Sequence, residues 1–397
     1  MRNARFNYRI YPTPDQESLL IQSIGCSRYV WNYFLNKEQE TYNQTQTFNY
    51  YQDNSRDLTQ LKKQLDWLRV PPAVALQQTL RNLDKAIRDS LPNTKRKVRL
   101  SFPKFKKRRP FSGSFNLAMI DLKSHTDTDN GRFRIPSIGW VKTVYHRPIP
   151  SNFKSATIVR DAGEWYVSLV VKIPLVNRTL TGKSVGLDMN SGAHVLSDNI
   201  RFDNPRYRRK SQARLKRLKR AVSRKQKNSH NRKKAQLRVS KMEKRIRCKR
   251  TDYFHKLSKR LIDDYDIICI EDLNVKAMQQ WNGRMIEDNG FGILRQMLQA
   301  KAEIYGNQVV VVDRYYPSSK TCSNCGAIHT GLSLHDRIYD CQACGNTIDR
   351  DLNAAINIHR AGTAQINASV VANGVPQMVT IGHIIGHDSA NEKSLVE

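Results

Sequence analysis

Several short segments of the chain alternate apolar and polar residues, and this period of two predicts β-strands. RFNYRIYP has this pattern near the start of the chain, and FRIPSIGWVKTVYH, SATIVRD and EWYVSLVVKIP have it between residues 115 and 173. The last two segments flank Asp161-Ala162-Gly163, a sequence typical of a tight turn. We expect the first strand and the later strands to close one small N-terminal β-barrel.

The residues between the first strand and the later strands have a helical period instead. The run TPDQ from Thr13 matches a capping box with proline at the first helical position, and VALQQTLRNLDKAIRDSL after two prolines predicts a second helical segment. Apolar residues recur near helical spacing after the capping box, at Leu20, Ile24, Trp31 and Leu35. Residues 11–110 are therefore predicted to form a helical module that is inserted into the barrel and ends in a basic loop.

A different pattern begins near Gly182. SVGLDMN and HVLSDN predict adjacent strands, and QVVVVDRYYP predicts another strand after a helix around Ile293–Tyr305. The run DIICIED is almost continuously apolar, which indicates a strand buried on both faces. Strands that alternate with helices predict an α/β domain in this half, so the whole chain is expected to combine α+β and α/β parts.

The residues between these strands predict a basic helical hairpin, residues 207–250. Arg208 to Arg250 contains 21 lysines and arginines in 43 residues, with Glu243 as its one acid. Apolar residues keep helical spacing on both sides of the break KNSHN, at Leu215, Leu218 and Val222 and then at Ala235, Val239, Met242 and Ile246. A membrane-surface helix would have a wider, aromatic apolar face, so nucleic acid is the better partner for this hairpin.

The charge of the whole chain points to the same class of partner. The 67 lysines and arginines against 35 acids give a formal net charge of +32, which repels itself in a compact fold unless a polyanion neutralises it. A merely soluble basic protein is the alternative. The basic loop, residues 95–110, has nine basic residues, no acid and two interleaved phenylalanines, which suits phosphate contact and base stacking, with a solvated loop as the alternative. Candidate contacts are Lys104, Lys106, Lys107 and Arg108 in the loop and Arg217, Arg220, Lys233 and Lys234 in the hairpin.

The sequence offers no sign of export or membrane insertion. Its start has no apolar signal-peptide core, and no apolar run approaches the ~18 residues of a membrane span. Four of the seven cysteines lie close together and three are isolated, which suits a reducing compartment better than a disulfide framework. We expect a soluble intracellular protein with no membrane partner and no small-molecule substrate.

The four clustered cysteines have the spacing of a zinc ribbon. Two Cys-x2-Cys pairs stand fifteen residues apart, and a glycine follows each pair, where a tight turn aims backbone amides at sulfur. The predicted zinc ligands are Cys322, Cys325, Cys341 and Cys344. A closed site of this kind is structural, and an iron–sulfur cluster is the less favoured alternative. The isolated Cys26, Cys248 and Cys269 are predicted to be packing residues.

Three acids lie at the ends of predicted elements, two at strand ends and one in the first turn of a helix. Asp188 closes an apolar strand, Glu271 ends the strand buried on both faces, and Asp351 lies in the first turn of a helix rich in small residues. This order is that of an RNase H-type nuclease site, in which two Mg²⁺ about 4 Å apart act on a phosphodiester. Structural acids that only cap turns are the alternative, and Asp349 is a good helix N-cap.

These motifs together resemble the TnpB proteins of insertion sequences, which are compact RNA-guided DNA endonucleases related to type V CRISPR effectors. The resemblance covers residues 1 to about 362. It rests on seven blocks in the order of the family: RIYPTPDQ with GCSRYVWNYFL, SFPKFKKRRP, VGLDMNSG, the hairpin ending RTDYFHKLSKRL, IICIEDLNVKAM, YPSSKTCSNCG and CGNTIDRDLNAAINI. Two features differ from the commoner family pattern, Met189-Asn190 after the first acid and Ile348 before the last acidic triplet, and neither removes a metal ligand.

The resemblance implies the following domains. A β-barrel wedge domain would comprise residues 1–10 and 111–180, around a helical recognition module of residues 11–110. An RNase H-like RuvC domain would comprise residues 181–316 and 346–362, with a zinc ribbon inserted at residues 317–345 and a tail of residues 363–397 that carries no readable signal. The catalytic magnesium ligands would be Asp188, Glu271 and Asp351, and neither His255 nor His359 would be needed as a general base.

The resemblance also implies a function. Family members bind a guide RNA from the end of their element, recognise a short motif beside the double-stranded DNA target, and cut both strands in the RuvC site. The protein would then be cytoplasmic, prokaryotic and nucleoid-associated. Gln77, with its neighbour Gln78, is a candidate for reading base edges of the target, with solvated surface residues as the alternative, and Tyr50 is a candidate for stacking or backbone contact. A guided DNA-binding regulator that does not cut and an RNase H-fold transposase are the alternatives. We expect the zinc hairpin to lie beside the carboxylates and to guide a nucleic-acid strand toward them.

Overall fold

The computed structural model of the chain folds into two compact units. One unit contains residues 1–174 and 214–245, and the other contains residues 175–213 and 246 onward. The structure describes residues 1–91, 101–176, 178–190, 192–275, 277, 278, 280, 288–333 and 336–372, with the side chains of 369–372 excepted. In these residues no helix is both long and apolar enough to cross a membrane.

The strands predicted near the N-terminus form one curled antiparallel sheet in the first unit. Its strands are β1 (Arg2–Tyr11), β2 (Ser112–Ala118), β3 (Thr126–Asp127), β4 (Arg132–Ile135), β5 (Gly139–Val144), β6 (Ser155–Asp161) and β7 (Glu164–Ile173), in the order β2-β6-β7-β1-β5-β4-β3. The edge strands β2 and β3 do not pair with each other in the described residues, so the sheet is a half-barrel and does not close as expected. The predicted turn between β6 and β7 is present, with Ala162 and Gly163 both at positive φ.

The alternating pattern reflects the burial of one face of this sheet, whose apolar side chains form a hydrophobic core. Tyr8, Ile10, Phe133, Val141 and Val167 are all fully or almost fully buried in it, and the polar residues between them face outward. Burial of this apolar surface is the main stabilising contribution to such a sheet.

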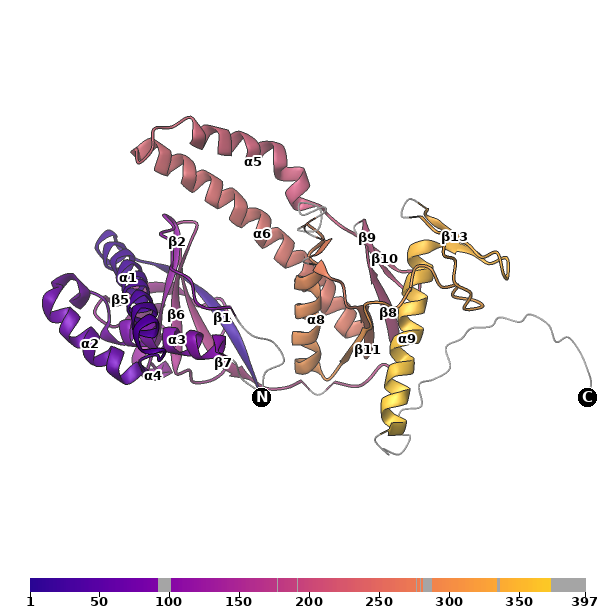
Figure 1. The fold of residues 1–397 in the computed structure, drawn as a ribbon, viewed down its shortest axis with the longest axis horizontal. Coiled ribbons are helices and arrows are strands. Elements are labelled where there is room, and N and C mark those ends of the chain that lie inside the picture. The colour runs from indigo at the N-terminus through magenta and orange to yellow at the C-terminus, as the bar shows by residue number, and fades with distance from the viewer. Residues whose placement is uncertain are drawn as a thin grey trace, which may run out of the picture. The chain divides into compact units, whose positions relative to one another are not determined.

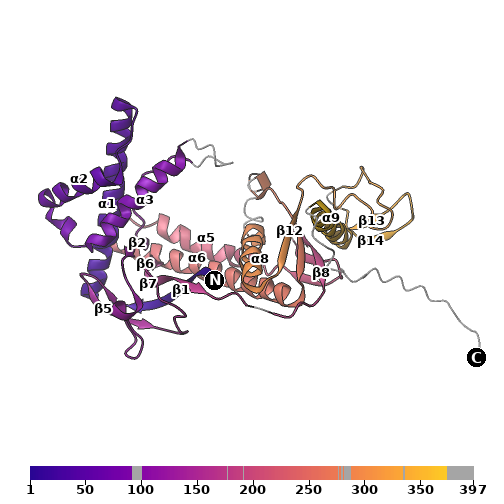
Figure 2. The ribbon, with the colours of Figure 1, turned by 90° about the horizontal axis from the view of Figure 1, so that it is seen from below.

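A helical module follows β1 in the chain, as predicted. The helices are α1 (Pro14–Thr45), α2 (Tyr51–Gln64), the short 3₁₀ helix Asp66–Arg69, and α3 (Ala73–Ser90), and Figure 2 shows α1, α2 and α3 side by side. The predicted capping box at the start of α1 is confirmed, because the Thr13 side chain accepts from the Gln16 amide while the Gln16 side chain accepts from the Thr13 amide. Phe34, Leu68, Leu76 and Leu80 form the core of the module. A short helix α4 (Leu122–His125) lies later, between β2 and β3.

The predicted basic hairpin is present as α5 (Tyr207–Ser223) and α6 (His230–Asp264), which turn at the expected break (Figure 1). Helix α6 continues beyond the predicted end at Arg250. Lys244 of α6 donates to the Tyr166 hydroxyl at 2.7 Å and pairs with Glu164, so this part of the hairpin is held to β7.

The second unit is built on a five-stranded mixed sheet. Its strands are β8 (Ser184–Met189), β9 (Ala193–Leu196), β10 (Arg201–Asp203), β11 (Ile267–Glu271) and β12 (Gln308–Val312), in the order β10-β9-β8-β11-β12. Strands β8, β11 and β12 are parallel, β9 runs antiparallel to β8, and β10 runs antiparallel to β9 and so in the same direction as β8.

Helices cover both faces of this sheet, as the apolar run of β11 predicted. Val185 and Leu187 of β8 and Ile268 and Ile270 of β11 pack with the C-terminal part of α6 and with α8 (Phe291–Tyr305). The alternate residues face α9 (Arg350–Ala372), where Cys269 packs with Val312 and Ile358. Figure 1 shows α8 and α9 on the two sides of the sheet.

The cysteine pairs lie in a small lobe between β12 and α9. It contains the two-stranded sheet β13 (Ile338–Asp340) and β14 (Thr347–Asp349), and Figure 2 shows this sheet beside α9. The tail expected to begin at residue 363 instead continues α9 as far as Ala372. One physical reason is the close contact between Gly362 of α9 and Cys269 of β11, since a Cβ added at Gly362 would lie 2.4 Å from the Cys269 sulfur. The helix therefore still packs on the sheet at residue 362. Residues 373–397 lie outside the described residues.

Candidate functional site

The register of two parallel strands brings the first two acids side by side. Gly186 pairs with Cys269 and Leu187 pairs with Ile270, so Asp188 and Glu271 come next on the neighbouring strands β8 and β11. Because side chains alternate along a strand, Asp188 lies on the same face as Gly186, and Glu271 lies on the same face as Cys269. This is the face that α9 covers.

The third acid comes from α9, which approaches β8 unusually closely. A Cβ at Gly186 would lie 2.1 Å from the Ala355 carbonyl oxygen and 2.6 Å from the His359 amide nitrogen, so only glycine fits between strand and helix. Asp351 lies one turn before Ala355, about 6 Å along the helix, and Asp188 lies two residues past Gly186, about 6.6 Å along the strand. The close packing therefore brings Asp351 toward Asp188.

The three acids, called the acidic site below, interact electrostatically. Burial raises the pKa of Asp188 well above its usual value, and the charges of Glu271 and Asp351 raise it further, whereas Arg350 opposes them. Burial also raises the pKa of Glu271, and a hydrogen bond from Ser318 partly offsets this. Three ionised carboxylates are unfavourable here unless a cation lies among them.

The carboxylate oxygens are less tightly gathered than the cysteine sulfurs. In the described part of the chain, the four cysteines form the group of three or more His, Cys, Asp or Glu side chains whose ligand atoms all lie within 4.8 Å of one another. Carboxylate and carbonyl oxygens are the ligands that Mg²⁺ prefers, so the donor set of the acidic site fits this ion.

Two polar residues that the sequence did not single out contact the acidic site. Asn190 donates from Nδ2 to Asp351 Oδ1 at 2.6 Å, and the Ser318 hydroxyl donates to Glu271 Oε1. No sequence motif predicts either contact, because each residue is far in sequence from the acid that it contacts. Asn190 was noted only as a departure from the family pattern.

Other polar residues near the acidic site have structural partners. Asp349 accepts from the amides of Asp351 and Leu352 at 3.0 Å, which confirms the N-cap predicted for it. His359 shares a 2.7 Å hydrogen bond with Ser184, and burial, with Arg360 adding to it, lowers its pKa.

Asp272, next to Glu271, is engaged elsewhere. It pairs with Arg295 and, at 2.6 Å, with Arg314. The hydrogen bond from Arg295 is the main cause that lowers its pKa, and Arg314 contributes to the same shift. The chain thus contains two consecutive acids of which one faces α9 and the other is neutralised by arginines.

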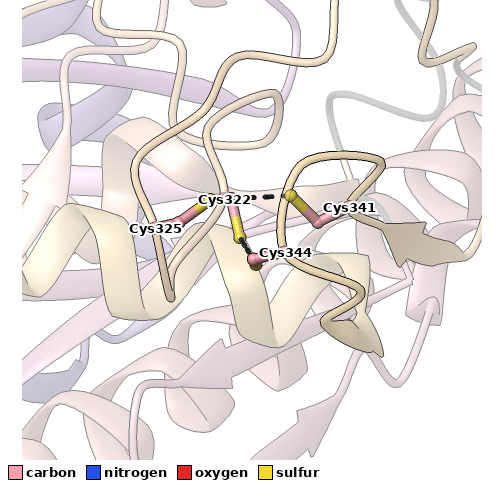
Figure 3. A group of neighbouring side chains, drawn as sticks. All are labelled: Cys322, Cys325, Cys341 and Cys344. Carbon is pink, nitrogen blue, oxygen red and sulfur yellow. Dashed lines mark hydrogen bonds between the residues drawn. The ribbon is translucent and has the colours of Figure 1, made fainter.

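The predicted cluster of four cysteines is present (Figure 3). The sulfurs of Cys322 and Cys344 are 3.7 Å apart, and those of Cys325 and Cys341 are 3.6 Å apart. A tetrahedral zinc with Zn–S bonds of about 2.3 Å implies sulfurs about 3.8 Å apart, so the four side chains fit a structural zinc ion. Gly326 and Gly345 have positive φ where each predicted knuckle turns back.

The close approach of α9 to β8 leads to a prediction for Gly186→Ala. The new methyl group would meet backbone atoms of α9, which cannot move aside as a flexible side chain can. We expect the free energy of unfolding to fall by about 3 kcal/mol, the upper end of overpacking costs, in thermal or denaturant unfolding. Gly292→Ala is the matched control, because nothing lies within 4 Å of its Cβ position in α8, and it should leave stability unchanged or slightly higher. Equal stability of both variants would contradict the close packing of α9.

The described part of the basic loop is held along α1. The Trp31 ring nitrogen donates to the Lys104 carbonyl oxygen at 3.1 Å, and Asn32 makes two hydrogen bonds with the Lys106 backbone. The Lys106 ammonium lies 3.5 Å from the centre of the Trp31 ring, and burial lowers its pKa to about 8. The predicted contacts Lys104, Lys107 and Arg108 are exposed, and Lys106 is exposed as a residue although its ammonium lies against Trp31. The loop residues before Ser101 lie outside the described residues.

A second basic surface lines a groove of about 440 Å³ between the hairpin and the end of the basic loop. Its lining includes Arg109, Phe111, Lys219 and Arg232, none of which was among the named candidates. The candidates on the hairpin, Arg217, Arg220, Lys233 and Lys234, are exposed on α5 and α6. Clustered charge predicted the surface but could not predict which residues face the groove.

The candidate base reader Gln77 and the candidate stacking or backbone contact Tyr50 lie on the helical module. Tyr50 is exposed at the start of α2, with the Arg88 guanidinium 4.9 Å from its ring centre, and Gln77 is exposed on α3. Gln78 donates to Asn82 at 3.0 Å on the same helix, so its amide already has a partner.

Three family models match the chain. They are described as "Helix-turn-helix domain" over residues 1–47, "Probable transposase" over residues 168–282 and "Cas12f1-like, TNB domain" over residues 291–358. In the structure, residues 1–47 contain β1 and the single long helix α1. The last model spans the cysteine cluster and Asp351.

Whole-length relatives match as well. A "Putative RNA-guided DNA endonuclease" of Streptomyces pristinaespiralis is 35% identical over 93% of this chain and 91% of its own length. "Putative RNA-guided DNA endonuclease InsQ" of Escherichia coli K12 is 29% identical over 94% of this chain and 96% of its own length. The structure is similar in fold to Cas12f1, as solved in a complex with sgRNA and target DNA, with a TM-score of 0.52 and 12% identity over 90% of this chain and 98% of that one.

These matches define the class as RNA-guided DNA endonucleases of transposable elements with a fold similar to Cas12f1. The chain belongs to the TnpB family, also named OrfB of IS605 elements. The resemblance stated from the sequence motifs is therefore confirmed.

Proposed function

We propose that this protein is a magnesium-dependent, RNA-guided endonuclease that cleaves double-stranded DNA next to a short motif, in an active site formed by Asp188, Glu271 and Asp351. One observation carries the proposal: the register of β8 with β11 and the close packing of α9 on Gly186 direct Asp188, Glu271 and Asp351 to the same face of the sheet, where the charges of Glu271 and Asp351 raise the pKa of Asp188. Acids that only capped turns would be solvated and separate. Partly buried carboxylates that repel one another are typical of a site built for cations.

The arrangement of the second unit supports a nuclease domain of RuvC type. The sheet order β10-β9-β8-β11-β12, in which β9 runs antiparallel to the other four strands, is the order expected of an RNase H-like domain. In this proposal the domain comprises residues 181–316 and 346–362, with the zinc ribbon inserted at residues 317–345. The half-barrel and the helical module would be the wedge and recognition domains.

The residues of the acidic site would bind and orient two Mg²⁺ ions. Bound there, the ions would supply an activated water and neutralise charge at the scissile phosphate. Asp188 and Glu271 would act from fixed strand ends, while Asp351 would act from the first turn of α9, where Asn190 orients its carboxylate. Asp272 would take no part, since Arg295 and Arg314 occupy it.

The partners proposed are a guide RNA from the element end and the double-stranded DNA target. The Cas12f1 structure of similar fold contains an sgRNA and target DNA. In this chain, the groove between the hairpin and the basic loop is lined by the cationic side chains of Arg109, Lys219 and Arg232, which suit contact with phosphates. Gln77 remains the proposed reader of base edges, and Tyr50 remains a proposed stacking or backbone contact.

The experiment that tests the function is purification of the full chain from cells that carry its element, followed by sequencing of the bound RNA. We expect one RNA species with a constant scaffold and a variable end. Replacing the variable end should redirect Mg²⁺-dependent cleavage to a plasmid that carries the matching sequence. Guided binding without any cleavage would support the regulator, and joined products that require element ends would support the transposase.

A further inference from the structure

The segment between β12 and the first cysteine pair contacts both candidate metal sites. Ser318 belongs to this segment, is 6% exposed, and donates its hydroxyl to Glu271 Oε1. Four residues further along, Cys322 begins the first cysteine knuckle, residues 322–326. The chain therefore runs directly from a partner of Glu271 to a sulfur of the cysteine cluster.

Helix α9 fixes the same segment with buried amides. Asn357 donates from Nδ2 to the Ser318 carbonyl oxygen at 2.8 Å and to the Thr321 carbonyl oxygen at 2.6 Å. Asn353, one turn earlier, donates to the Thr321 carbonyl oxygen at 2.7 Å and accepts from the Ser323 amide at 2.8 Å. Asn353 and Asn357 are 0% and 2% exposed, so these bonds are shielded from bulk solvent.

These hydrogen bonds link the first cysteine knuckle, Ser318 and the acidic site through α9. The first knuckle and the Ser318 backbone are both held by one face of α9, and α9 also carries Asp351 in its first turn. The side chain of Glu271 has three rotatable bonds, and a hydroxyl bound to Oε1 selects one orientation while it leaves Oε2 free.

We propose that Ser318 is a positioning residue for Glu271, and that Asn357 couples its placement to the folded state of the first cysteine knuckle. The inference rests on the proposed nuclease function. It assigns the zinc ribbon a second task besides guiding a strand: the ribbon holds one carboxylate of the acidic site ready for a cation. Outer partners of metal ligands generally orient them in this way, and their loss costs roughly 10–100-fold in metal affinity or activity.

The test uses the full-length protein with its co-purified guide RNA and measures cleavage of a matching plasmid over a Mg²⁺ titration. Ser318→Ala should raise the Mg²⁺ concentration for half-maximal cleavage by roughly 10-fold or more, with the rate largely recovered at saturating Mg²⁺. Ser318→Thr keeps a hydroxyl and should stay close to the parent protein. Ser319→Ala is the matched control, because this neighbouring hydroxyl makes no hydrogen bond in the described structure and should leave the titration unchanged.

The shape of the titration separates positioning from a merely structural role. Damage to the fold would lower the rate at every Mg²⁺ concentration, together with the bound zinc measured by mass spectrometry. An unchanged Mg²⁺ midpoint for Ser318→Ala, whatever its maximal rate, would overturn the inference while leaving the proposed function intact if the parent protein still cleaves and Asp188→Asn does not. A parent protein that holds its guide RNA and never cleaves would overturn both.

Discussion

Asp188→Asn should abolish guided DNA cleavage while the protein keeps its guide RNA and its target. The substitution preserves shape but removes one of three charges that would hold Mg²⁺ at the acidic site. Loss of an outer partner of a metal ligand already costs roughly 10–100-fold, so loss of a direct ligand should reduce the cleavage rate by more than about 100-fold. The measurement is single-turnover cleavage of a guide-matched plasmid, with binding measured by gel shift without Mg²⁺.

The same variant should be more stable than the parent protein when no Mg²⁺ is present. Burial and two neighbouring carboxylates make an ionised Asp188 unfavourable in the folded chain, and the neutral amide removes this repulsion. We therefore expect a higher Tm for Asp188→Asn in buffer without Mg²⁺ and without a chelator, so that bound zinc is kept, with the difference reduced when Mg²⁺ is added. Asp272→Asn is the contrasting control, because Asp272 pairs with Arg295 and Arg314 and its loss should lower the Tm. A Tm unchanged or lowered in Asp188→Asn would show that the acids do not repel one another.

Cys341→Ser should impair cleavage strongly and leave guide RNA binding largely intact. Removal of one thiolate opens the tetrahedral cluster, and structural zinc supplies much of the folding free energy of so small a lobe. The lobe packs on α9 through Asn353 and Asn357, so its unfolding should disturb the acidic site. The basic surfaces on the hairpin and the basic loop belong to the other unit and should keep their guide RNA.

The measurements are bound zinc by mass spectrometry, guide RNA by extraction and quantification, and plasmid cleavage. Cys248→Ser is the matched control, since this cysteine is exposed on α6 away from the cluster, and it should retain zinc, RNA and cleavage. If Cys341→Ser lost the guide RNA as well, the lobe would be needed for the whole fold. If it cleaved normally, the lobe would be unnecessary for the acidic site.

Local sequence was sufficient for the features whose causes are local. The capping box at Thr13, the turn at Ala162-Gly163 and the break in the basic hairpin depend on residues a few positions apart, and all three are present as predicted. The two Cys-x2-Cys pairs also predict their cluster, because each knuckle places two sulfurs by itself and only the two knuckles need to meet.

The half-barrel shows where local pattern was insufficient. Alternation predicted the strands and which face is buried, but closure depends on whether the two edge strands meet. In the structure β2 and β3 are at opposite edges of the sheet. The curvature of the complete sheet decides this separation, and it cannot be predicted from the residues of any single strand.

For the acidic site, the sequence by itself determined which acids stand at strand ends and at the start of a helix, because a strand buried on both faces and a helix N-terminus are both visible in the order of residues. Only the tertiary structure decided that Gly186 lets α9 touch the sheet, that Arg295 and Arg314 neutralise Asp272, and that Ser318 and Asn190 contact Glu271 and Asp351. The physical reason is range. Hydrogen bonds and ion pairs act over a few ångströms, and these partners are brought that close only when β8, β11 and α9 have packed together.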